Sequence, residues 1–168
     1  DRMWELAARA SRLEGELASH SRKLEAIEKR GRALRAEIGR KVEELAGEES
    51  RALREAALER ERAHDMTERS QSARAEYDRH RAVVDRGQAD GRTYDAVGAE
   101  RAGIETFNRV HSEYSERASI KEQYGAGLRK QIDDLKNQLQ RYSEALENDL
   151  QAGRDRIATR VREALGYE

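Results

Sequence analysis

Apolar residues recur at alternating steps of three and four along the first half of the chain, which is the heptad pattern of a coiled coil. The row consists of Met3, Leu6, Ala10, Leu13, Leu17, His20, Leu24, Ile27, Gly31, Leu34 and Ile38. From Ile38 to Val42 the step of four is repeated, a stutter that locally unwinds a supercoil, and Leu45 then restores the alternation. The pattern predicts one long helix over residues 1–86.

The middle of this row is poor in large apolar residues. In the phase that continues from Leu45, Glu49 and Glu59 fall on seam positions, whereas Leu53 and Leu58 lie beside the row. The remaining seam residues in this phase are Ala52, Ala56, Ala63, Met66, Ala73, Tyr77, His80 and Val84. The phase therefore either shifts in this region or leaves two glutamates in the seam.

The rhythm breaks clearly once, between Arg86 and Thr93, where Gly87 and Gly91 bracket small and polar residues. We expect a turn over residues 87–94 and a second long helix over 95–168, capped by Thr93 or Asp95. Its seam is predicted to contain Phe107, Val110, Tyr114, Ile120, Tyr124, Leu128, Ile132, Leu135, Leu139, Tyr142, Leu146, Leu150, Gly153, Ile157, Val161 and Ala164. The predicted fold is all-α, a long antiparallel coiled-coil hairpin with the two helices as one unit.

A second architecture breaks the helices again at Gly47 and at Gly125–Gly127, which gives an up-down four-helix bundle. The hairpin is favoured because the apolar rhythm continues through both sites. In the hairpin, Gly125 and Gly127 face the alanine-rich residues 52–63, so that small residues lie opposite small residues.

Composition supports ordered helices and excludes several functional classes. The 168 residues contain neither proline nor cysteine, 40% are charged, 36% are hydrophobic, and the net charge is −1. Thiolate zinc sites and disulfides are therefore excluded. We find no apolar run that would span a membrane and no basic stripe for nucleic acid. Arginine is far more frequent than lysine, which indicates GC-rich coding and favours a bacterial source.

Candidate chemistry is sparse, so we predict no catalytic residue, no cofactor and no metal ligand. Glu61 and His64 have the Glu-x-x-His spacing of di-iron bundles, but such a site needs a second copy of the motif and two further glutamates. His20, His80 and His111 have no glutamate three residues earlier. A helical-bundle metalloprotein remains the alternative among enzymes and metal-binding proteins.

Two sets of residues are predicted to bind protein partners. One is the hairpin tip, with Arg79, Arg81, Val83, Val84, Arg86 and Arg92. The other is an interface that includes Trp4, Leu53, Leu58, Tyr114, Tyr124 and Tyr142, because flanking apolar rows and aromatic residues widen the apolar face beyond what one partner covers. We expect the hairpin to form a homodimer and to be cytoplasmic.

The sequence favours a non-enzymatic coiled-coil protein or segment that acts as a scaffold and mediates protein–protein interaction and oligomerisation. An arm of a chromosome-organising protein is an alternative, which would require globular parts on either side. In shape and composition the chain also resembles the hairpin stalk proteins of flagellar and type III export machines. Likeness at this level assigns no function.

Overall fold

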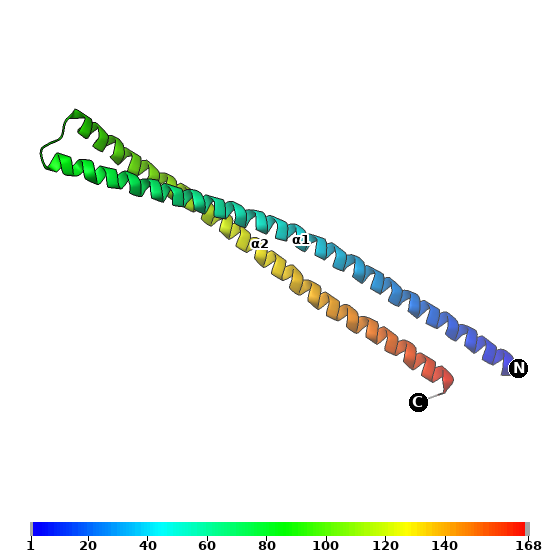
Figure 1. Ribbon diagram of the computed structural model, residues 1–168. Helices are drawn as coiled ribbons and strands as arrows, with labels where there is room; N and C mark the ends of the chain where they lie inside the picture. Colours follow the sequence, from blue (N-terminus) through cyan, green and yellow to red (C-terminus); the bar gives the residue numbers. More distant parts are fainter. Residues whose placement is uncertain (1, 167–168) are drawn as a thin grey trace. The chain divides into compact units, whose positions relative to one another are not determined.

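The chain folds into two long helices joined by one short loop (Figure 1). In this computed structural model, which describes residues 2–166, α1 spans Arg2–Asp85 and α2 spans Gly91–Leu165. The predicted helical hairpin is confirmed, and the described residues contain no strand. The four-helix alternative is wrong, because α1 continues through Gly47 and α2 through Gly125 and Gly127.

The loop shows why the chain reverses where it does. Gly87 has φ +71°, a left-handed conformation, and its N–H donates to the carbonyl of Val84 at 3.0 Å. The N–H of Gln88 donates to the carbonyl of Val83 at 3.2 Å. These two bonds form a Schellman motif, which satisfies the last carbonyls of α1.

The second helix begins at Gly91, four residues earlier than predicted, because its cap is Asp90 and neither Thr93 nor Asp95. The Oδ1 atom of Asp90 accepts hydrogen bonds from the backbone N–H and the hydroxyl of Thr93, both at 3.0 Å. This is the bond from an N-cap carboxylate to the third helical residue, so the turn is shorter than the predicted 87–94. At the other end, α2 ends at Leu165. Residues 167 and 168, which were included in the predicted helix, lie outside the described part of the chain.

The contribution of the Asp90 cap to the stability of the fold is expected to depend on pH. Hydrogen bonds from Thr93 lower the pKa of Asp90 below its ordinary value of 3.8. A lowered pKa in the folded state stabilises the fold above the unfolded pKa, and this contribution is lost as the pH falls through the folded pKa. We therefore expect Asp90→Ala to lower the midpoint of thermal unfolding at pH 6. The difference in midpoint from wild type should shrink as the pH is lowered towards about 2. Circular dichroism at each pH measures both midpoints.

Asp90→Asn is the matched control, because it keeps the acceptor oxygen but does not titrate. Its midpoint should lie between those of wild type and Asp90→Ala at pH 6. An Asp90→Ala variant with an unchanged midpoint at pH 6 would show that this cap does not hold the turn.

The paired helices divide into two compact units. One contains residues up to Glu44 together with those from Gln131 onward, and the other is Leu45–Lys130. In the first unit Ile132, Leu146 and Leu150 are buried, Leu146 lies against Gly31, and Leu24 lies against Gly153. Large side chains of one helix therefore occupy the spaces left by glycines of the other.

The unit Leu45–Lys130 has a seam of a different kind. Its buried residues are mainly small: Ala52, Ala56, Ala63 and Ala118, with Gly125 against Ala52 and Leu53. Leu45 and Leu128 are the large apolar residues buried there. Small side chains let two helix backbones approach closely, and the seam keeps the phase that includes Glu49 and Glu59, which are both buried.

The predicted α2 seam is wrong between Tyr114 and Leu128. The row passes through Ala118, Lys121 and Gly125, whereas Ile120 and Tyr124 lie outside it and are 58% and 57% exposed. Lys121 fits beside the seam because its ammonium group reaches Glu55 at 3.3 Å while its stem covers apolar surface. Gly127 is also exposed and does not face the alanines.

Candidate interaction surfaces

Two buried glutamates occupy the seam of the unit Leu45–Lys130. Arg129 of α2 donates from Nε and Nη2 to the two carboxylate oxygens of Glu49, at 2.8 and 2.7 Å. Glu59 contacts Arg62 at 3.2 Å and Lys121 at 3.8 Å, but its Oε2 atom has no hydrogen-bond partner among the described residues. The first pair is a bidentate fork between the helices, and the second is incompletely satisfied.

The large apolar residues of this unit lie on two different flanks. Leu53 and Leu58 are 48% and 47% exposed and five residues apart, so they point about 140° away from each other around α1. The predicted interface that includes both residues is therefore not one face of the molecule. Each flank has to be considered separately.

The first flank, here called the Leu53 flank, contains Leu53, Arg60, Glu122 and Arg129. Arg60 donates from Nε and Nη2 to the carboxylate of Glu122, at 3.0 and 3.1 Å. This hydrogen bond lowers the pKa of Glu122 and raises that of Arg60. Because Arg129 is also bound to Glu49, the charges on this flank already have partners across the two helices.

The second flank, here called the Leu58 flank, contains exposed residues of both helices: Arg51, Glu55, Leu58, Arg62 and Asp65 of α1, and Glu113, Arg117, Ile120 and Tyr124 of α2. The Tyr124 hydroxyl donates to Glu48 at 3.3 Å. A surface depression of about 230 Å³ runs across both helices, lined by Glu48, Arg51, Ala52, Glu55, Lys121 and Tyr124. Arg51 and Glu113 form no ion pair with any described residue, whereas Arg62 pairs with Glu59 and Asp65 with Arg69, both at 3.2 Å. Arg117 lies over the Tyr114 ring at 5.5 Å.

The predicted tip residues differ in their exposure and in their ion-pair partners. Arg79 pairs with Glu76 at 3.8 Å and Arg81 with Asp85 at 3.6 Å, and both valines, Val83 and Val84, are half-buried. Arg86 and Arg92 are exposed and form no ion pair within residues 2–166. The exposed aromatic residue next to the loop is Tyr94, which the sequence analysis did not select.

Two histidines, His80 and His111, link the helices by hydrogen bonds. Nδ1 of His80 lies 2.7 Å from Glu100, a carboxylate that is mostly buried. Nδ1 of His111 lies 2.8 Å from the carbonyl of Ala63, and since a carbonyl only accepts, this nitrogen carries a hydrogen. His64 of the Glu-x-x-His spacing instead pairs with Glu68 on the surface, at 3.2 Å. Within residues 2–166 no three potential metal-ligating side chains come together.

The unit that contains the chain ends has further exposed apolar residues. Trp4 is 77% exposed, and Leu6 and Leu165 are also exposed; the latter two line a groove of about 570 Å³ together with Glu16 and Arg160. Arg160 donates to Glu16 at 2.8 Å, which lowers the pKa of Glu16. The predicted interface residues Tyr114 and Tyr142 are half-buried and belong to the seams.

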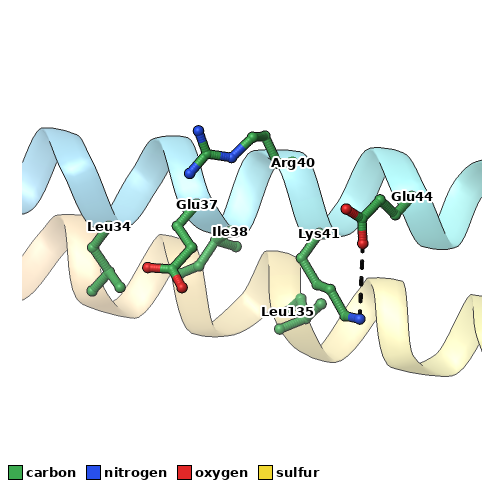
Figure 2. Close-up of a pocket in the computed structure, with 7 residues that line it drawn as sticks. All are labelled: Leu34, Glu37, Ile38, Arg40, Lys41, Glu44 and Leu135. Carbon is green, nitrogen blue, oxygen red and sulfur yellow. Dashed lines mark ion pairs between the residues drawn. The ribbon is translucent and has the colours of Figure 1, made fainter.

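A shallow pocket of about 340 Å³ in the same unit has the ordinary surface of a coiled coil. Figure 2 shows Leu34 and Leu135 between the two helices, whereas Arg40 points away from α2. Lys41 and Glu44 pair at 4.0 Å along the edge of α1. The lining is three apolar side chains covered by four charged ones, which is the pattern expected at the edge of a helix seam.

Neither α1 nor α2 contains, within residues 2–166, a stretch that is long and apolar enough to cross a membrane. Comparison of the chain with protein-family models, with curated proteins and with solved structures finds no match.

Proposed function

We propose that the chain is a non-enzymatic coiled-coil protein or segment that acts as a scaffold by binding other protein surfaces. The observation that carries this proposal is that, in the unit Leu45–Lys130, small residues occupy most buried seam positions and large apolar residues lie exposed outside the seam. Between Leu45 and Leu128 the buried seam residues are alanines, a glycine and two glutamates, while Leu58, Ile120 and Tyr124 lie on the outer surface. A coiled coil that works alone gains most by placing its large apolar residues in the seam.

Large apolar residues on an exposed flank typically mark an interaction site when charged residues surround them. On the Leu58 flank, the surrounding charges come from both helices and have both signs. The hairpin supports such a site because it holds two helix surfaces in one fixed register. The interhelical contacts Glu49–Arg129, Glu55–Lys121 and Arg60–Ser119 follow one another in this register.

Site-specific photo-crosslinking in cells of the source organism tests the proposal. A benzophenone amino acid at Ile120 should form an adduct with a protein, because the side chain lies at the centre of the Leu58 flank. The matched control is the same probe at Ala126, which is exposed on α2 but about 120° around the helix from Ile120. Adducts that are absent at both positions, or equal at both, would contradict the proposal.

A further inference from the structure

We propose that a second copy of this chain covers the Leu58 flank, antiparallel to the first, across a two-fold axis at the level of Leu58 and Ile120. This inference rests on the proposed function and names the partner of the same surface. It is carried by the order of charges along the flank.

The residues of the flank form one stripe on each helix. Measured from Leu58 at 100° per residue, Arg51, Glu55, Arg62 and Asp65 all fall within an arc of about 80°. The same holds on α2 for Glu113, Arg117 and Tyr124, measured from Ile120. The two stripes face the same side of the helix pair, because the Tyr124 hydroxyl reaches Glu48 and the Lys121 ammonium reaches Glu55.

Leu58 and Ile120 lie at the same level along the pair. The contact between Glu55 and Lys121 lies on one side of this level, and the hydrogen bond from Arg60 to Ser119 lies on the other side. Leu58 on α1 and Ile120 on α2 are therefore the exposed aliphatic residues at the middle level of the flank.

Charges are arranged in opposite order on the two sides of this centre. Towards the loop, the next level carries Arg62 and Arg117, and the level after it carries Asp65 and Glu113. In the other direction Glu55 comes first and Arg51 second. These levels lie about 5 and about 10 Å from the centre, since a helix rises 1.5 Å per residue.

A two-fold rotation that reverses the direction of the second copy brings opposite charges together. In this arrangement α1 lies on α1 of the partner copy, Leu58 meets its own symmetry mate, Glu55 meets Arg62, and Arg51 meets Asp65. On α2, Ile120 meets its own mate, and the Tyr124 ring meets Arg117, a favourable cation–π geometry. One self-complementary patch is what closed two-fold symmetry requires.

The parallel arrangement brings like charges together instead. Two copies that run in the same direction place α1 on α2 of the partner, so that Arg62 meets Arg117 and Asp65 meets Glu113. Like charges that face each other across an interface disfavour it, and complementary charges determine orientation more than affinity. The apolar centre provides the attraction, and the charge order selects the antiparallel copy.

Sedimentation of the purified full chain tests the association. Wild-type protein at tens of micromolar should sediment at twice the mass of one chain, and Leu58→Asp should shift it to a monomer with unchanged helicity. Leu53→Asp is the matched control, because Leu53 has the same side chain and almost the same exposure on the other flank. A fully helical wild-type monomer, or a dimer that Leu53→Asp dissociates and Leu58→Asp does not, would overturn the proposal.

Disulfide formation between introduced cysteines tests the orientation, because the chain has no native cysteine that would compete. A mixture of Glu55→Cys and Arg62→Cys chains should form a mixed disulfide at least several-fold faster than either variant alone forms its own dimer. Pairing of Arg62→Cys with Arg117→Cys, in place of the 55–62 pair, would overturn the antiparallel arrangement. If Ile120 crosslinks in cells to a different protein while the purified chain is monomeric, the second copy is rejected and the proposed function stands.

Discussion

Replacing Arg129 with leucine is expected to lower the free energy of unfolding by about 2 kcal/mol, less than for a fully buried pair because the Arg129 side chain is 51% exposed. The guanidinium forms a bidentate fork with Glu49, at 2.7 and 2.8 Å, and the Glu49 side chain is 11% exposed in a seam of alanines. Removing the cation leaves a carboxylate with little water around it and no charge opposite it. The cost of an uncompensated buried charge exceeds what the pair contributes while it is intact.

Three variants separate this effect from lost packing. Arg129→Lys should lose an intermediate amount, because a lysine cannot reproduce the planar fork. Lys130→Leu is the control at an exposed neighbour and should change stability by less than about 0.5 kcal/mol. Glu49→Leu combined with Arg129→Leu should recover most or all of the loss, since the carboxylate that Arg129 compensates is then also removed.

Urea unfolding followed by circular dichroism at one fixed protein concentration is the measurement, because self-association would make the midpoint depend on concentration. If Arg129→Leu loses less than about 0.5 kcal/mol, or if the double variant is no better than the single one, then Glu49 is not held by this pair.

The architecture was predictable because its signals are strong and local. A proline-free heptad rhythm over most of 168 residues predicts long helices, and one polar segment with two glycines predicts one reversal. Gly87 does supply the left-handed residue that ends α1. The start of α2 was missed because Asp90, Thr93 and Asp95 are all good caps, and only the geometry shows which side chain accepts the bond.

The seam of α2 was misjudged because periodicity gives weight to large apolar residues. Ile120 and Tyr124 lead to Leu128 in steps of four and are more hydrophobic, although Ala118, Lys121 and Gly125 keep the alternation of three and four. What decides between them is the closeness of the helices, which depends on the alanines and Gly125 that lie against each other. This is a property of the pair, so the pattern of one helix does not contain it.

Only part of the Leu58 flank was predicted from the sequence, for the same reason. Leu58 was selected because it lies beside the seam, but it was grouped with Leu53, although the helical angle between them separates the two. Ile120 was placed in the seam, and its position level with Leu58 depends on a register between residues 62 positions apart. Contacts such as Arg60–Glu122 and Lys121–Glu55 give that register, and the order of charges across the flank follows from it.

The close approach of the helices predicts that a larger seam residue destabilises this unit. In an ordinary heptad seam, changing alanine to leucine adds buried apolar surface and stabilises the coiled coil. Ala118 is completely buried, so the three additional carbon atoms of leucine have no space unless the helices move apart. We expect Ala118→Leu to lower the free energy of unfolding by about 2 kcal/mol, the usual cost of overpacking.

Ala126→Leu is the matched control, because this alanine lies eight residues further along α2 and is exposed. It should change the free energy of unfolding by less than about 0.5 kcal/mol. Both variants are compared with wild type by urea unfolding at the same protein concentration. An ordinary heptad seam predicts that Ala118→Leu raises the free energy of unfolding, whereas a seam packed on small residues predicts that it lowers it. A variant that is more stable than wild type would therefore show that the helices are not packed on small residues at this level.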